Sequence, residues 1–152
     1  DDYIELIKER AHGARGEDAS ASAKATLALA LSVQLRLFAP FLPFVTEEVW
    51  SWWQPGLIHS SQWPTVDELA AAAGGDAQVL VDAGIVLSQI RKAKSEAKVS
   101  MRTPVATTVV EGPAAIVDRV ALAAGDLTAA GSVQDLTITA TDVDQLNIAV
   151  TL

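Results

Sequence analysis

The stretch 37–64, LFAPFLPFVTEEVWSWWQPGLIHSSQWP, constrains the fold of this chain more than any other. It holds all four tryptophans and all three phenylalanines. Pro40 and Pro43 each remove a backbone donor and disfavour helix at the residue before them. The sequence therefore predicts that one helix ends near Phe38, that the chain turns sharply through PFLP, and that a second helix begins at Pro43.

Helices are also predicted before this corner. Residues 1–12 carry apolar side chains at helical spacing and end at Gly13, and a second helix follows with Ser20 or Ser22 as its N-cap. The leucines in 27–37 alternate, which indicates a strand when taken alone. Leu, Ala, Gln and Arg favour helix, however, and the run is too long for a typical strand. Wound as a helix, it presents two opposed apolar stripes, so we predict a central bundle helix packed on both sides.

The second half of the chain changes character after a long helix. Asp76 is a suitable cap for a helix that runs from Ala77 to about Val99. Its predicted apolar stripe has steps of four and three and consists of Val79, Ala83, Val86, Ile90, Ala93 and Ala97. After the break at Thr103-Pro104, the chain is predicted to alternate between strand and helix. β-Branched residues predict strands at 105–111, 133–140 and 145–152, and Pro113 opens a helix over 113–124.

These elements predict a fold that is mostly α with a small α+β part. We expect a helical bundle followed by a small three-stranded sheet with one or two helices packed on it. Residues 1–64 would form part of the bundle. Residues 65–152 would form the long helix and a small α/β appendage, with a boundary that could instead fall near residue 100.

The charges are unevenly distributed along the chain. A net charge of -8 argues against free-standing nucleic-acid binding, because phosphate contacts need Lys and Arg. The segment 91–102 nevertheless carries five bases against the single acid Glu96. A continuous helix would place Arg91, Lys94 and Lys98 as a basic stripe on one face. The face could follow a phosphate backbone, or it could be a solvated helix end whose cations complement the helix dipole. The five bases are Arg91, Lys92, Lys94, Lys98 and Arg102.

No catalytic or metal-binding constellation is predicted. Glu47 and Glu48 are adjacent on a helix, so their carboxylates diverge by about 100° and cannot share a proton. His12 and His59 are isolated in the sequence, without metal-ligand spacing. The chain has no cysteine, and therefore neither a disulfide nor a thiolate site. No cofactor is expected to bind this chain, and no apolar run predicts a membrane span or a signal peptide.

The tryptophans are the remaining candidates for contact with a ligand, because an indole ring can stack on a nucleic-acid base. Trp50 and Trp63 are predicted to pack in the core or at its edge. Trp52 and Trp53 point in different directions on a helix, so one of the two is expected to be exposed. We therefore count Trp52 and Trp53 with the five bases as candidate site residues.

Three motifs resemble one known family. The segments APFLPFVTEEVW and IHSSQWP resemble the end of the helical anticodon-binding domain of class I aminoacyl-tRNA synthetases of the valine, isoleucine and leucine group. DDYIELIKERAHG resembles an earlier helix of that domain, and RKAKSEAKVSMRTPV is most similar to the part that follows it in bacterial valyl-tRNA synthetases. The resemblance covers about the first two thirds of the chain and is weak beyond Val105. The isoleucyl enzymes are the alternative within the family.

The resemblance implies a tRNA partner, in the first instance a valine tRNA, bound through its anticodon arm. The HIGH- and KMSKS-like signatures of class I catalysis are absent from this sequence. ATP, Mg²⁺ and the ligation of valine to tRNA would therefore belong to other domains of a parent enzyme that is monomeric and cytoplasmic. A different class of function, a helical scaffold that binds protein through its tryptophan-rich face, stays open.

Overall fold

A computed structural model describes residues 2–152, and its contacts divide the chain into two compact units. The α/β unit contains the chain up to Glu17 and the chain from Asp76 to Leu152, and the helical unit is Asp18–Gly75. This division differs from the predicted cut after residue 64. The reason is that Leu6 of the first helix is buried in the core of the α/β unit, so the two ends of the chain fold together.

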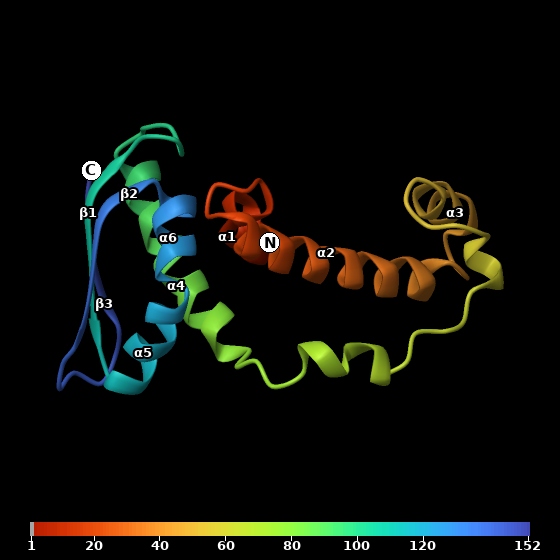
Figure 1. The fold of residues 1–152 in the computed structure, drawn as a ribbon. Helices are drawn as coiled ribbons and strands as arrows, with labels where there is room; N and C mark the ends of the chain where they lie inside the picture. The colour runs from red at the N-terminus through yellow and green to blue at the C-terminus, as the bar shows by residue number, and fades with distance from the viewer. Residues whose placement is uncertain (1) are drawn as a thin grey trace. The chain divides into compact units, whose positions relative to one another are not determined.

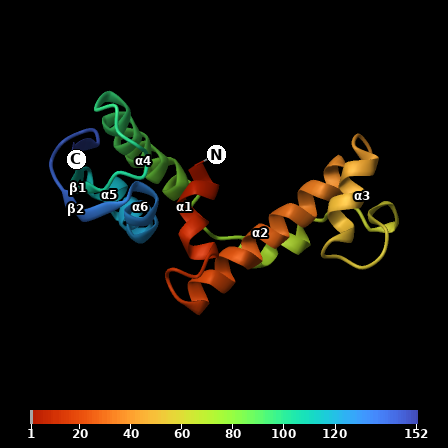
Figure 2. The same cartoon turned by 90° about the horizontal axis from the view of Figure 1, so that it is seen from above.

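The α/β unit has three layers of chain: a sheet, the helices that cover one of its faces, and the first helix packed on those helices (Figures 1 and 2). Strand β1 is central in the order β2-β1-β3, parallel to β2 and antiparallel to β3. The elements are α1 (Asp2–Ala11), α4 (Gln78–Glu96), β1 (Val105–Gly112), α5 (Ala114–Leu122), α6 (Ala124–Gly131), β2 (Val133–Ala140) and β3 (Asn147–Thr151).

The predicted fold class is confirmed by these elements, with one helix more than the sequence indicated. Helix α5 corresponds to the predicted helix over 113–124, whereas α6 was not predicted. The two helices connect β1 to β2, which are parallel neighbours and therefore need a crossover connection. β3 returns on the far side of β1, so the last two strands are not paired with each other.

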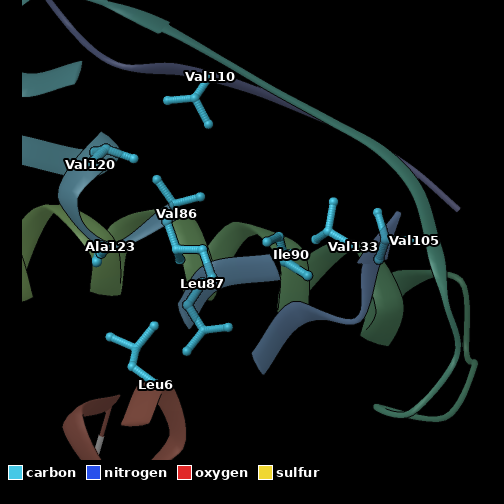
Figure 3. Packing of buried hydrophobic residues seen from close by; sticks show 11 residues of the cluster. Leu6, Val86, Leu87, Ile90, Val105, Val110, Val120, Ala123 and Val133 are labelled. Atoms are coloured by element: carbon cyan, nitrogen blue, oxygen red, sulfur yellow. The ribbon is translucent and has the colours of Figure 1, made fainter. Parts of the chain in front are cut away.

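The core of the α/β unit lies between α4 and the sheet (Figure 3). Val86, Leu87 and Ile90 of α4 are fully buried, and Val86 points toward Val110 of β1. The helical periodicity predicted for α4 is therefore confirmed in its central turns. The opposite face of the sheet is polar and rich in threonine, as expected for a sheet covered on one side only.

The helical unit forms around the proline corner. Helix α2 (Glu17–Phe38) ends and α3 (Pro43–Ser51) begins where the prolines predicted. Two 3₁₀ helices, η1 (Ile58–Ser60) and η2 (Asp67–Ala72), lie on the segment that leads back to the α/β unit. A small core joins α2, α3 and η1 and consists of Leu35, Ala39, Trp50 and Ile58.

Two predictions about α2 were wrong. The helix begins at Glu17, because acidic residues are favourable in a first turn, so Ser20 and Ser22 lie inside it. It is also not packed on both sides within this chain: Leu31 is 38% exposed and Leu37 is 41% exposed. Of the two predicted apolar stripes only Leu35 is buried, since few elements of the helical unit lie against α2.

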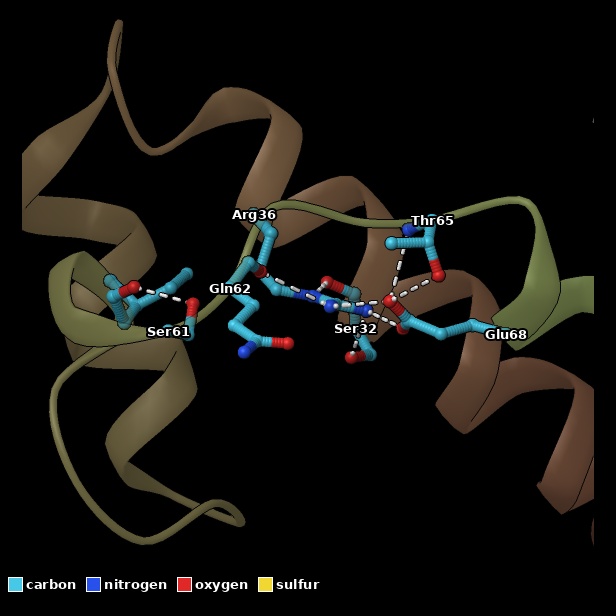
Figure 4. Close-up of polar contacts among 7 residues, drawn as sticks. Ser32, Arg36, Ser61, Gln62, Thr65 and Glu68 are labelled. Atoms are coloured by element: carbon cyan, nitrogen blue, oxygen red, sulfur yellow. Dashed lines mark hydrogen bonds and ion pairs between the residues drawn. The ribbon is translucent and has the colours of Figure 1, made fainter.

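An arginine on α2 holds the return segment in place (Figure 4). The Arg36 guanidinium donates to the carbonyl oxygen of Gln62 at 3.3 Å and to both carboxylate oxygens of Glu68. Glu68 also accepts the backbone N–H of Thr65 at 3.0 Å. The hydrogen bond from Arg36, followed by that from Thr65, lowers the pKa of Glu68 from its ordinary value of 4.5 to about 2. This polar clamp adds to the small apolar core of the unit.

Candidate nucleic-acid interface

The predicted basic stripe on α4 does not form, because Lys94 points into the protein. Its side chain is 1% exposed, and its Nζ donates to the carbonyl oxygens of Met101 and Gly131, both at 2.8 Å. Burial lowers the pKa of this ammonium group. The signal was present in the sequence: Lys94 lies four residues after Ile90, on the buried side of the helix. A direct contact between Lys94 and RNA is excluded by this burial.

Arg91 and Lys92 lie on different sides of the same helix. Arg91 donates to Asp2 at 3.2 Å and lies 3.6 Å from Glu5, so it faces α1. Lys92 lies 3.9 Å from Glu96 and belongs to a hollow beside β3. Their separation follows from the 100° step between neighbouring residues on a helix.

Lys98 and Arg102 lie on the loop after α4, and both are exposed. The helix stops at Glu96, before the predicted end at Val99, because Lys98 adopts a left-handed backbone conformation with a φ of 55°. No ion pair within residues 2–152 holds the side chain of Lys98 or Arg102. Both cations are therefore available to a ligand.

Arg91 and Arg102 share a groove with a residue that sequence reasoning missed. A cavity of about 490 Å³ lies between α1, the end of α6 and the loop after α4, and Lys8 of α1 lines it beside the two arginines. Glu5 and Glu9 are also in its lining. Lys8 is far from the basic cluster in the sequence, and only the packing of α1 against α6 and α4 brings it there. No sequence signal could have found it.

The tryptophans separate into buried and exposed side chains. Trp50 is 8% exposed, as predicted, and the partly buried Trp53 packs on it with ring centroids 5.9 Å apart and an interplanar angle of 59°. Trp52 is 70% exposed, and its indole N–H donates to Glu48 at 3.2 Å. Trp63 is 58% exposed, so its predicted place in the core was wrong. Of the two candidates for base stacking, Trp52 has the more exposed indole ring.

The carboxylates of α3 have structural partners. Glu47 accepts the backbone N–H of Ile58 at 3.1 Å and so ties η1 to α3. His59 lies 3.9 Å from the same carboxylate. Across residues 2–152, nowhere do three His, Cys, Asp or Glu side chains gather as ligands for a metal ion. Among the helices of this same part of the chain, none has the length and apolar character needed to span a membrane.

Comparison with known proteins identifies relatives along the whole chain. The chain is 52% identical to a valine–tRNA ligase from Thermobifida fusca over 153 aligned residues, which cover 100% of the chain and 17% of the ligase. It is 48% identical to the valine–tRNA ligase of Cutibacterium acnes, over 90% of the chain and 16% of the ligase. The Salinispora tropica valine–tRNA ligase is 49% identical, over 90% of the chain and 18% of the ligase.

The chain thus spans less than a fifth of the length of these relatives. A sequence family described as the anticodon-binding domain of tRNA ligases matches residues 1–110. That match covers the helical unit, α1, α4 and most of β1, and it contains all seven candidate site residues. The chain belongs to the family of anticodon-binding domains of tRNA ligases.

Proposed function

We propose that this chain is the tRNA-binding region of a valine–tRNA ligase and holds the anticodon arm of a valine tRNA. The observation that carries the proposal is the 52% identity to a valine–tRNA ligase along the entire chain, together with the match of residues 1–110 to the anticodon-binding domain. In such a domain, cations fix the RNA backbone while polar or aromatic groups contact unstacked bases.

The chemical step would take place in other domains of a longer enzyme. That enzyme would use ATP and Mg²⁺ to ligate valine to its tRNA, as a monomer in the cytoplasm. Within the described chain, the Glu47 carboxylate accepts the backbone N–H of Ile58 and the Glu48 carboxylate accepts the indole N–H of Trp52. The contribution of this region is to position the RNA, a binding role that needs no reactive side chain.

The candidate contacts keep most of the predicted residues. Lys92, Lys98 and Arg102 are proposed to contact phosphates, whereas Arg91 is paired with Asp2 and Glu5. Trp52 is proposed to stack on a base, since its ring is exposed. Lys94 and Trp53 are not proposed as contacts, because Lys94 is buried and Trp53 is partly buried against Trp50.

The proposal is tested by titrating the 152-residue chain at low salt with transcribed valine tRNA, isoleucine tRNA and a valine tRNA with an exchanged anticodon. Tryptophan fluorescence is the readout, because all four tryptophans lie in the helical unit. We expect the valine tRNA to bind at least about tenfold more tightly than the other two RNAs, a difference of about 1.4 kcal/mol.

Each alternative gives a different result in the same titration. Tighter binding of the isoleucine tRNA would assign the chain to the isoleucyl branch instead. Equal affinity for all three RNAs and for heparin would overturn the proposal and favour a helical scaffold that binds protein. The exposed rings of Phe41, Phe44 and Trp52, at 78%, 91% and 70% exposure, would then be the surface to examine.

A further inference from the structure

We propose that the cavity between α1, α6 and the loop 97–104, here named the α1–α6 groove, binds the phosphodiester backbone of the tRNA. Lys8 and Arg102 make the contacts, and the buried Lys94 is a positioning residue that holds the groove in shape. The inference rests on the proposed function and adds to it a site on α1 and α6, outside the basic cluster that the sequence revealed.

The charge of the groove suits a phosphate chain. Three cations, Lys8, Arg91 and Arg102, line it together with Glu5 and Glu9. Arg91 lies 3.6 Å from Glu5 and compensates that carboxylate. Within residues 2–152, Lys8 and Arg102 form no ion pair, so their charges face solvent without a partner. The chain as a whole has a net charge of -8, but these two unpaired cations favour an anionic ligand in this groove.

The shape of the groove favours an extended ligand over a single small anion. A second hollow, of about 520 Å³, shares Glu9, Ala129 and Ser132 with the first, so the two adjoin along α6. Arg15 lines the second hollow and is paired with Asp126. The shared floor carries side chains no larger than a methyl or hydroxymethyl group at Ala129 and Ser132. A polynucleotide backbone can therefore lie along α6 with the cations on the walls.

Lys94 ties two walls of this groove together from inside the protein. Its Nζ donates to the carbonyl oxygen of Met101, the residue before Arg102, and to that of Gly131, the residue before Ser132. Both bonds are 2.8 Å long, and no carboxylate in the described chain pairs with this buried ammonium. The charge is compatible with the carbonyl end of α6, where the helix dipole is negative. A buried cation is costly unless it is hydrogen-bonded, and these two bonds satisfy the ammonium group while they tie Met101 to Gly131.

The contacts are tested with a matched pair of lysines. Lys8 and Lys24 are both exposed helical lysines without an ion pair in the described chain, and only Lys8 lines the groove. The logarithm of the valine tRNA affinity is measured against the logarithm of salt concentration. We expect Lys8→Ala and Arg102→Ala each to reduce the slope by about 0.7–0.9, the value for one phosphate contact. Lys24→Ala is expected to leave the slope unchanged.

The outcomes separate this inference from the proposed function. Equal slopes for Lys8→Ala and Lys24→Ala would overturn the α1–α6 groove, while an intact preference of the unmodified chain for valine tRNA would keep the proposed function. If the unmodified chain shows no preference for valine tRNA, the proposed function is overturned, whatever the slopes of the variants. Binding of an acidic peptide to the groove in place of RNA would also contradict the inference.

The positioning role of Lys94 is tested with a double-mutant cycle for tRNA binding. We expect Lys94→Met to weaken binding as much as Arg102→Ala, and the double variant to bind no more weakly than Arg102→Ala alone. If Lys94 only stabilises the fold, the two losses multiply instead, and the assignment is overturned. The surface variants Lys8→Ala and Arg102→Ala keep the groove testable should Lys94→Met fail to fold.

Discussion

The two units of this chain use apolar residues in different ways. The α/β unit closes a core in which Val86, Leu87 and Ile90 are 0% exposed. In the helical unit the core is small, while Phe41 and Phe44 at the proline corner are 78% and 91% exposed. A sheet covered by helices surrounds its core with chain, whereas two helices joined by a tight corner cannot enclose theirs. Hydrophobic content alone therefore does not make a closed core.

An ion pair of the α/β unit also has a more deeply buried carboxylate than its counterpart in the helical unit. In the α/β unit, Arg119 of α5 donates to Asp82 of α4 at 2.6 Å, and the carboxylate side chain is 5% exposed. In the helical unit, the carboxylate of the Arg36–Glu68 pair is 34% exposed. The first pair joins two helices beside a closed core, and the second holds a return segment at the surface. Four substitutions test this contrast: Ile90→Ala with its matched control Leu31→Ala, then Asp82→Asn, and finally Glu68→Gln.

The largest expected effect is a loss of core packing in the α/β unit. Ile90→Ala should destabilise that unit by about 2–5 kcal/mol, because it removes buried methyl groups and leaves a cavity. Amide hydrogen exchange of α4 and β1 measures the change in opening free energy.

The matched change in the helical unit is Leu31→Ala on α2. Two-sided packing would have made this substitution equally costly, but Leu31 is 38% exposed. We expect a loss below about 1 kcal/mol in the exchange of α2 amides, as for a surface position. Equal losses at the two positions would mean that the contrast between the units is not one of packing.

An effect smaller than that of Ile90→Ala is expected from the buried carboxylate of the α/β unit. Asp82→Asn preserves the shape of the side chain and removes its charge, so the charge-assisted hydrogen bond from Arg119 is lost. The expected destabilisation is about 1.5–3 kcal/mol, measured by urea denaturation. Arg119→Gln on its own, and together with Asp82→Asn, completes a cycle; additive losses would show that the two side chains do not interact.

The smallest effect is expected at the Arg36–Glu68 pair and is confined to acid. The pKa of Glu68 is lowered to about 2, so the stability it contributes is fully present above pH 4.5 and is lost as the pH falls towards 2. Glu68→Gln should remove this part of the acid dependence of the helical unit, followed by tryptophan fluorescence. An unchanged profile between pH 4.5 and 2 in Glu68→Gln would contradict the assignment.

Local chemistry predicted the elements well. The prolines placed the end of α2 at Phe38 and the start of α3 at Pro43, because a proline acts on its own residue and its immediate neighbours. The strand Val133–Ala140 has the predicted bounds, since its β-branched residues fit a pleated, half-buried surface. Helix α6 was missed because its sequence, AGDLTAAG, has glycines at the second and last positions and little periodicity.

Contacts between distant parts of the chain could not be predicted from local sequence patterns. Helical spacing places Lys94 on the apolar side of α4, but the two carbonyl oxygens that accept its hydrogen bonds there come from other segments of the chain. Helical periodicity also gives no sign that Lys8 and Arg102 line one groove, or that α1 belongs to the same unit as the sheet. Each of these facts depends on contacts between residues many positions apart, which no local preference specifies.

The amino-acid sequence was sufficient for the family, the order of the helices and strands, and the segment rich in cations. Those properties are carried by residues that are neighbours in the chain, where backbone sterics and side-chain type act directly. The direction of each cation was decided by tertiary packing: Lys94 inward, Arg91 towards α1, Lys92 towards β3, and Arg102 into the groove with Lys8. A surface that binds an extended ligand is built from several elements, so its residues become neighbours only when those elements pack together.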